Sequence, residues 1–377
     1  MTKTLCSAPF FHQVVHSTGQ YNLCCSARTT TGKDYSDWNG ADYQAIRKHM
    51  LEEDELPAEC MLCTEQEESG AGSQREQLFR LYNSLDRPAL DTVTGTSMDA
   101  PISLDLRMNN LCNLSCRMCG PEASTMILKE AKKNPDLPLW DDHDVKLAEK
   151  VHPFDIETLI KNAGSIFDLS LLGGEPSVQP ESIALLEELV RLKKTNIRLF
   201  ITTNGTNHNP KFFNLIQQFN RLCVTVSIDG WGKQHEYIRG PGANWDTIWK
   251  NVKKIQGMAN NPKMMLQQTV TTLNIFDFWK LNKFNDTGIE IMTFHTYGPP
   301  KYSPMNIPDK WKKIAISIAK ENSQYEENSN IWHQMNKPGD IKFVKGMKDY
   351  TAMLDSVRNQ YLIDNFPIAY EMFEDIG

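Results

Sequence analysis

The chain has 377 residues, of which 40% are hydrophobic and 23% charged, and its formal net charge is −7. This length suits one large domain plus a smaller one, and the acidic balance argues against a nucleic-acid partner or an anionic membrane surface. Since the N-terminus lacks the apolar core of a signal peptide and no apolar run approaches the ~18 residues of a membrane span, we expect a cytoplasmic protein without a membrane partner. Nine cysteines in such a protein favour reduced thiols that bind metal over disulfides.

Five of the nine cysteines fall in the first 80 residues, where long apolar runs are missing. Bound metal would then replace part of a hydrophobic core. The four thiolates of Cys6, Cys24, Cys60 and Cys63 suffice for a four-iron cluster or for a structural zinc ion, and the spacing leaves both open. Cys25 is adjacent to Cys24 and is an alternative ligand.

From residue 101 to 300, apolar runs of strand length alternate with amphipathic stretches of helix length. Strands are predicted at Ile102–Arg107, Ile166–Leu172, Ile197–Thr203, Leu222–Ile228, Met265–Thr271 and Ile289–His295. Helices are predicted between them at Pro180–Lys194, Lys211–Asn220, Asn244–Met258 and Phe276–Asn285. This alternation predicts a parallel sheet, and six units fit a partial (βα)6 parallel barrel of the α/β class.

The sequence therefore predicts four parts. Residues 1–80 form a small cysteine-rich domain, and residues 81–100 form a linker because Asp86–Ala100 contains Pro, Gly, Thr and Asp. Residues 101–300 form the barrel. Residues 301–377 form a helical C-terminal tail, with helices expected at Asp309–Asn322 and Lys345–Asp364, that covers an open barrel edge.

Three cysteines follow the first barrel strand with the spacing Cys-x3-Cys-x2-Cys: Cys112, Cys116 and Cys119. Three thiolates can hold three irons of a four-iron cluster and leave the fourth open for chemistry, just as an open position distinguishes catalytic from structural zinc. The alternative, a zinc knuckle, needs a fourth ligand, and no His or Cys lies close downstream.

Further motifs close the next strands: Leu171–Pro176, Ile201–Gly205 and Val226–Gly230, with Tyr237–Gly240 after them. In parallel barrels the chemistry lies at the C-terminal ends of the strands, so we expect these motifs to meet the three cysteines at one mouth. In order and position, the cysteines and motifs resemble the radical S-adenosylmethionine (SAM) superfamily.

The resemblance implies that Cys112, Cys116 and Cys119 hold a four-iron cluster whose open iron chelates SAM. One electron then splits SAM, and the 5′-deoxyadenosyl radical abstracts hydrogen from substrate. The resemblance also implies SAM contacts, in which the planar guanidinium of Arg239 pairs with the SAM carboxylate. Arg239 could instead be a solvated loop residue, and Gly173 and Gly174 could instead form an ordinary strand-to-helix turn. The implied contacts are Met118, Gly173, Gly174, Glu175, Thr203, Asn204, Ser227, Asp229 and Arg239. Met118 stands where the family usually has an aromatic residue.

The N-terminal cysteines resemble the auxiliary-cluster modules called SPASM and twitch domains, including the Gly-x4-Cys element from Gly19 to Cys24. In most relatives this module follows the barrel, whereas here it precedes it. The resemblance implies a second four-iron cluster held by four cysteines, and full ligation favours electron transfer or a structural role. The glycine spacing favours Cys24 over Cys25.

The leading functional hypothesis is oxidative modification of a peptide or protein side chain, with the second cluster as electron acceptor and a reductant such as flavodoxin or ferredoxin as partner. The alternatives are oxidation or rearrangement of a small carbohydrate or cofactor precursor, RNA modification, and a non-enzymatic scaffold. No catalytic acid or base is assigned. Candidate substrate contacts, each also a candidate structural group, are Gln268, Asn274, His295 and Tyr297, and Cys223 is expected in the core.

Overall fold

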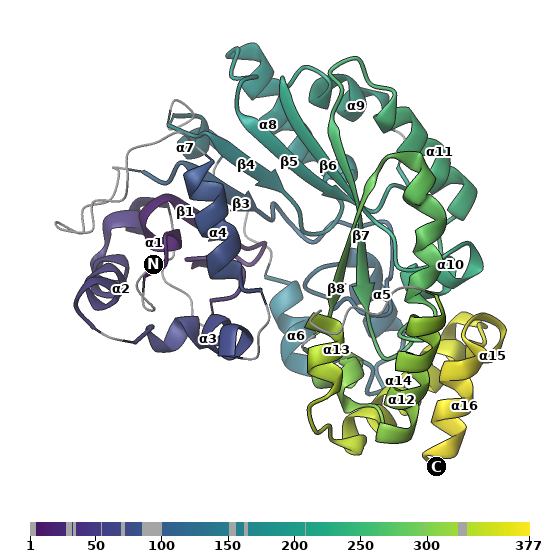
Figure 1. The fold of residues 1–377 in the computed structure, drawn as a ribbon. Coiled ribbons are helices and arrows are strands. Elements are labelled where there is room, and N and C mark those ends of the chain that lie inside the picture. The colour runs from purple at the N-terminus through teal and green to yellow at the C-terminus, as the bar shows by residue number, and fades with distance from the viewer. Residues whose placement is uncertain are drawn as a thin grey trace.

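The computed structural model describes most of the chain around one eight-stranded sheet, with strand order β2-β1-β3-β4-β5-β6-β7-β8 (Figure 1). Within the described residues, β2 and β8 remain the two edges of this sheet, as expected for an incomplete barrel. Most of the predicted linker and the candidate Tyr297 lie outside the described residues. The residues that the structure describes are 5–27, 32, 35–53, 55–68, 72–84, 100–150, 156–161, 165–207, 209–296, 298–322 and 330–377.

The six predicted strands are confirmed, and each runs parallel to its neighbour. They are β3 (Ser103–Leu106), β4 (Asp168–Leu171), β5 (Arg198–Thr203), β6 (Arg221–Ser227), β7 (Lys263–Val270) and β8 (Glu290–His295). In β3 to β7 the apolar runs correspond to strand residues that are buried in the core. The leucines of one face, Leu104, Leu169 and Leu199, are register partners and share a core with Leu185 of the following helix.

Two further strands come from the N-terminal segment and were not predicted. β1 (His12–Val15) pairs parallel with β3, and β2 (Tyr21–Asn22) pairs antiparallel with β1. Both are very short, and β1 begins with two polar residues, so neither has the apolar pattern of a buried strand. The N-terminal segment therefore extends the parallel sheet, and the division of the chain at residues 80 and 100 stays a prediction.

Helices cover the sheet and make up most of the C-terminal third (Figure 1). No described helix combines the length and the apolar character needed to span a bilayer. The N-terminal and barrel helices are α1 (Ala8–Phe11), α2 (Ala41–Glu52), α3 (Met61–Glu68), α4 (Gln74–Asn83), α5 (Thr125–Lys133), α6 (Asp142–Ala148), α7 (Ile156–Lys161), α8 (Pro180–Arg191), α9 (Pro210–Ile216), α10 (Lys233–Arg239) and α11 (Trp245–Gln256). The tail contains α12 (Asp309–Glu321), α13 (Asn330–Met335), α14 (Ile341–Arg358), α15 (Leu362–Asn365) and α16 (Pro367–Asp375).

Two predicted helices differ from the structure. The stretch expected at Phe276–Asn285 is a 3₁₀ helix over Phe278–Thr287. The helix expected at Lys345–Asp364 is divided into α14 and α15, because Asn359 adopts a left-handed conformation with φ of 50° that ends α14. Asparagine tolerates this conformation better than most residues.

Three hydrophobic cores hold the molecule together. The largest lies between the sheet and helices α8, α9 and α11, and a second joins the tail helices to α10. The third lies in the N-terminal segment and includes Cys6, Cys24 and Trp38. In the view of Figure 1, α1–α4 gather beside β1 and β3, whereas α12–α16 gather below β7 and β8.

Candidate functional site

The segment after β3 carries the three closely spaced cysteines, and we call residues 107–120 the cysteine loop. Cys112 and Cys116 are buried and Cys119 is half-buried. The Cys119 backbone N–H donates to the Cys116 carbonyl at 3.1 Å, which turns the chain so that both side chains belong to one compact loop. The loop follows the C-terminal end of its strand, where a parallel barrel carries its chemistry.

Two polar side chains, one from the end of β5 and one from the end of α10, reach the thiols. Asn204 Nδ2 lies 3.9 Å from Cys112 Sγ, and Arg239 Nη1 lies 3.8 Å from Cys116 Sγ. A hydrogen bond from Cys119 and the nearby guanidinium of Arg239 lower the pKa of Cys116, whereas the hydrogen bond with Cys116 and burial raise the pKa of Cys119, and burial raises that of Cys112 to about 12. A thiol with a lowered pKa gives up its proton readily, and the thiolate is the metal ligand. The loop therefore places three thiols together, of which Cys116 gives up its proton most readily, and three thiolates are a ligand set for iron.

The glycine pair at the end of β4 brings this strand end against the cysteine loop. Gly173 and Gly174 have φ of +75° and +58°, in the left-handed region. A Cβ on Gly174 would lie 2.5 Å from the carbonyl oxygen of Leu111, and a Cβ on Gly173 would lie 2.7 Å from the Cβ of Arg107. Only glycine permits this combination of conformation and close approach. The pair thus shapes the loop, and its contact with SAM stays a prediction.

Glu175 is buried and joins the ends of β4 and β5 through its carboxylate. Oε1 accepts hydrogen bonds from Ser177 N at 3.1 Å, Ser177 Oγ at 2.5 Å and Thr203 Oγ1 at 2.7 Å, and Oε2 accepts one from Asn204 N at 2.6 Å. Burial raises the pKa of Glu175, and these four donors oppose that effect. The structure therefore brings together three predicted site residues, Glu175, Thr203 and Asn204.

Asp229 and Arg239 form a second pair at the ends of β6 and α10. Asp229 Oδ2 lies 2.5 Å from Arg239 Nε, and Oδ1 accepts a hydrogen bond from Thr269 N at 2.8 Å. Burial by itself lowers the pKa of Arg239, but the Asp229 carboxylate outweighs it and raises this pKa above its ordinary value. Ser227 is buried at the end of the same strand. Arg239 is therefore a fixed cation beside Cys116.

Met118 is half-buried and packs against the core of the tail helices and α10. Its proposed place over an adenine ring stays a prediction. Two of the candidate substrate contacts have their side-chain amides bonded to backbone oxygens: Gln268 Nε2 donates to Phe278 O at 3.2 Å, and Asn274 Nδ2 to Asp229 O at 2.9 Å. These two are structural groups here. His295 is buried at the end of β8, and Cys223 is buried within β6 as expected.

Four N-terminal cysteines line one cavity. Cys6, Cys24, Cys60 and Cys63 share it with apolar side chains and Arg75, whereas the exposed Cys25 does not line it. The apolar lining is Ala8, Pro9, Leu23, Ala27, Met50, Leu56 and Leu78.

This cavity is chemically suited to a metal centre. Burial, together with repulsion between neighbouring thiolates, raises the pKa of Cys6 and of Cys60 to about 12. Such thiols lose their protons at neutral pH only when a bound cation replaces them. Four cysteines match the ligand number of a fully ligated four-iron cluster. Among the described residues, no three His, Cys, Asp or Glu side chains are arranged to hold a single metal ion.

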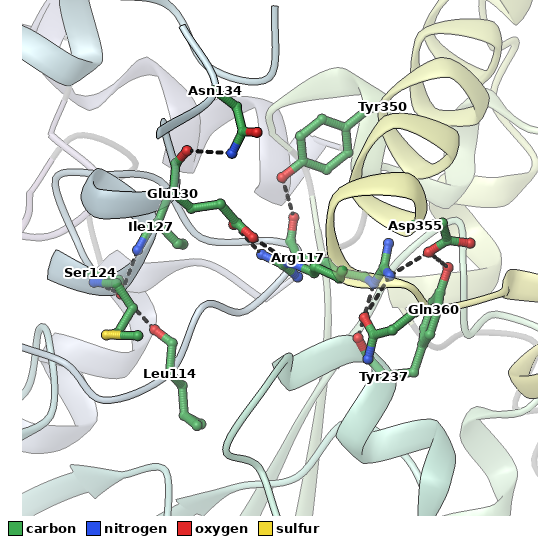
Figure 2. Close-up of polar contacts among 12 residues, drawn as sticks. Leu114, Arg117, Ser124, Ile127, Glu130, Asn134, Tyr237, Tyr350, Asp355 and Gln360 are labelled. Atoms are coloured by element: carbon green, nitrogen blue, oxygen red, sulfur yellow. Dashed lines mark hydrogen bonds and ion pairs between the residues drawn. The ribbon is translucent and has the colours of Figure 1, made fainter. Parts of the chain in front are cut away.

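Sequence reasoning missed the residues that tie the cysteine loop to the tail. Arg117, inside the loop, contacts Asp355 and Gln360 of the C-terminal helical region, and Figure 2 shows these contacts. Asp355 lies 238 residues further along the chain. No local pattern in the sequence pointed to this pairing.

Residues 106–275 match the family model described as the Radical SAM superfamily. The sporulation killing factor maturation protein SkfB of Bacillus subtilis (strain 168) is 28% identical over 195 residues, which cover 50% of this chain and 40% of SkfB. The molybdenum cofactor biosynthesis protein 1 of Dictyostelium discoideum is 20% identical over 259 residues, which cover 66% of this chain and 38% of that protein. The chain thus spans about two fifths of the length of these curated relatives.

Two solved structures were also similar. Streptococcus suis SuiB bound to the precursor peptide SuiA matches with 15% identity and a TM-score of 0.38, over 71% of this chain and 51% of SuiB. Native anSMEcpe with bound AdoMet matches with 16% identity and a TM-score of 0.39, over 57% of this chain and 58% of that chain. The family match and the cysteine loop lead to one conclusion: residues 106–275 form a domain of the radical SAM superfamily, a superfamily of enzymes.

Proposed function

We propose that this protein is a radical SAM enzyme that oxidatively modifies a peptide or protein side chain. The observation that carries the chemistry is the cysteine loop, in which Cys112, Cys116 and Cys119 stand together inside the matched domain. Three thiolates leave one iron of a four-iron cluster open. Held by these three residues, such a cluster would bind SAM at its open iron and would supply the electron for reductive cleavage of SAM, the source of the radical that removes hydrogen from a substrate carbon.

The chain's own residues prepare the place for SAM. Asp229 holds Arg239 through Nε, and Nη1 points to Cys116 Sγ, so Nη2 is the group proposed to meet the carboxylate of SAM. A planar guanidinium suits a carboxylate because it offers two parallel N–H donors. Gly173 and Gly174 expose strand-end backbone to the methionyl amine, and Asn204 lies toward the ribose.

Cys6, Cys24, Cys60 and Cys63 are proposed to hold a second four-iron cluster. That cluster would take up the electron that the substrate radical loses when it is oxidised. Its support is the single cavity that the four thiols line. A zinc ion with four cysteine ligands is the alternative, and it would stabilise the segment without accepting electrons. An external reductant such as flavodoxin or ferredoxin would reduce the first cluster.

The choice of a peptide or protein substrate is supported by the name of the 28% identical relative, which is a maturation protein. A cofactor precursor is the second candidate, because the 20% identical relative is named for molybdenum cofactor biosynthesis. The matched regions cover 40% and 38% of these relatives. A product assay with added substrates separates the two candidates. Deoxyadenosine formation that rises only when a peptide is added would support the first candidate, and a rise only with a small precursor would support the second.

The cluster assignment is tested by anaerobic reconstitution followed by iron, sulfide and zinc quantification. We expect about eight irons per chain in the wild type and about four in the Cys112/Cys116/Cys119→Ala triple variant. Dithionite-treated wild type should release 5′-deoxyadenosine from SAM, and the triple variant should not. Cys223→Ala is the matched control, because Cys223 is buried in β6 and belongs to neither cysteine group. About four irons per chain together with bound zinc in the wild type would contradict the proposal of a second four-iron cluster.

A further inference from the structure

Arg117 lies inside the cysteine loop, between Cys116 and Cys119, and its side chain points toward Asp355 and Gln360 of the C-terminal tail (Figure 2). It is only 1% exposed. Nη2 donates to Asp355 Oδ1 at 2.5 Å and to Gln360 Oε1 at 2.9 Å, and Nε donates to Tyr237 O at 2.9 Å. The guanidinium also stacks 3.7 Å from the centre of the Tyr237 ring. A buried arginine with this many directed contacts has little freedom to move.

The backbone of Arg117 is held by the same surroundings. Its carbonyl oxygen accepts hydrogen bonds from the hydroxyls of Tyr302 at 2.9 Å and Tyr350 at 3.0 Å, and its N–H donates to Ile238 O at 2.8 Å. Tyr350 belongs to α14, and Ile238 to α10. The peptide units on both sides of Arg117 are therefore fixed by groups outside the loop.

Asp355 is itself held in place, which makes it a firm anchor. Its Oδ1 also accepts a hydrogen bond from the hydroxyl of Tyr237 at 2.8 Å, and its Oδ2 accepts one from the backbone N–H of Leu362 at 2.8 Å. The second bond spans the break between α14 and α15. Asp355 thus links the loop, α10 and the tail at one point.

A second contact ties the tail to the helix that follows the loop. Arg358, at the end of α14, donates to both carboxylate oxygens of Glu130 in α5, at 2.9 and 2.7 Å. The Arg358 side chain is 1% exposed, so this two-bond pair is protected from solvent. Helix α14 therefore contacts the chain on both sides of Cys119, at Arg117 and at Glu130.

We propose that helix α14 sets the shape of the cysteine loop, with Arg117 and Asp355 as positioning residues for Cys116 and Cys119. The consequence for catalysis rests on the proposed function. Arg117 follows Cys116 directly and stands two positions before Cys119. A shift of its backbone therefore moves both thiols. Loss of the clamp should alter how the iron centre is held and how SAM meets it, without removing any ligand.

The test uses full-length protein, reconstituted anaerobically with iron and sulfide, as wild type, Asp355→Asn, Arg117→Lys and Glu374→Gln. We expect Asp355→Asn to take up iron but to lose it to a chelator at least about tenfold faster than wild type, because a buried arginine is left without its charged partner. Its electron paramagnetic resonance spectrum with SAM should also differ from wild type. Arg117→Lys should be intermediate, since lysine keeps the charge but not the planar fork.

Glu374→Gln is the matched control. Glu374 pairs with Lys348 at 3.5 Å between α16 and α14 and is 57% exposed, so its loss should change neither iron release nor the spectrum. A wild-type spectrum and wild-type iron release in Asp355→Asn would overturn the proposal, even if that variant melted at a lower temperature. A merely structural role of Asp355 would lower the melting temperature alone.

Hydrogen–deuterium exchange of the full chain before reconstitution gives a readout that does not depend on iron. In Asp355→Asn, amides of residues 112–120 should exchange at least about tenfold faster, while the central strands β4–β6 keep wild-type rates. Unchanged exchange in the loop, or an equal increase throughout the chain, would contradict the clamp. If the wild type takes up no iron, the proposed function fails, and this exchange measurement still decides the role of α14.

Discussion

Arg239 and Asp229 form an ion pair in which Nε lies 2.5 Å from Oδ2, with the aspartate completely buried and the arginine side chain 11% exposed. The pair joins the end of β6 to the last turn of α10, and the free end of the guanidinium reaches Cys116. Asp229 therefore decides where a positive charge stands beside the cysteine loop.

Replacing this aspartate tests its positioning role. In Asp229→Asn the amide oxygen can still accept from Thr269 N, but Arg239 stays buried without a charged partner. We expect a loss of about 3–5 kcal/mol in the free energy of unfolding, measured by urea titration. In reconstituted protein, the Kd for SAM should rise at least about tenfold, because Arg239 is no longer aimed. An unchanged Kd would separate Arg239 from SAM binding.

Gly174 should not tolerate a side chain. In Gly174→Ala the new Cβ meets Leu111 O at 2.5 Å while φ stays near +58°, so both the conformation and the contact are unfavourable. We expect a loss of about 1–2 kcal/mol from the left-handed conformation alone, with the contact adding to it. Iron uptake should fall as well, because the loop backbone must move.

Gly346→Ala is the control for this substitution. Gly346 lies in α14, and a Cβ there meets nothing within 4 Å. Alanine should therefore stabilise the helix by about 0.5–1 kcal/mol. Thermal unfolding of the two variants gives opposite signs in this prediction. A neutral Gly174→Ala would show that the end of β4 can withdraw from the cysteine loop at no cost.

The two adjacent N-terminal cysteines should differ in their effect on iron content. Cys24 lines the cavity with Cys6, Cys60 and Cys63, whereas Cys25 is exposed. We expect Cys24→Ser to lower the iron content of reconstituted protein from about eight to about four, and Cys25→Ser to leave it unchanged. The reverse result would make Cys25 the ligand. Equal iron in both variants would mean that either thiol suffices.

Glu175→Gln should be costly although it changes one atom. The carboxylate accepts hydrogen bonds from four donors, at least one on each oxygen. An amide NH₂ in place of either oxygen is itself a donor and cannot accept those hydrogen bonds. We expect a loss of about 1–3 kcal/mol in the free energy of unfolding. The control is Glu187→Gln, which breaks an exposed pair with Lys211 and should cost at most about 1 kcal/mol. A Glu175→Gln variant as stable as this control would refute the linking role of Glu175.

The elements recognised from sequence were those whose local pattern matches their environment. Strands β3 to β8 alternate with helices and carry apolar runs, because helices cover one face of the sheet. Strand β1 was not predicted because it begins with the polar residues His12 and Gln13, and its pairing with β3 is not visible in its own sequence. The break at Asn359 was not predicted either, because a left-handed asparagine ends α14 there and lets α15 pack against α10 and α16.

The candidate site divides in the same way. The cysteine spacing, the glycine pair and the acidic and basic residues near the strand ends are local features of the sequence. The cysteines are local because a site that needs closely spaced thiolates is most simply built from one short segment. Their partners are not local. Thr203 and Asn204 meet Glu175 only because β4 and β5 are neighbours in the sheet.

By itself the amino-acid order determined the superfamily and the parallel α/β architecture, since each depends on spacing and periodicity within a few tens of residues. Only the tertiary structure decided that N-terminal strands join the sheet, that four distant thiols line one cavity, and that Arg117 is held by Asp355. These contacts join residues far apart in the chain, and their energy comes from burial and hydrogen bonding that exist only after folding.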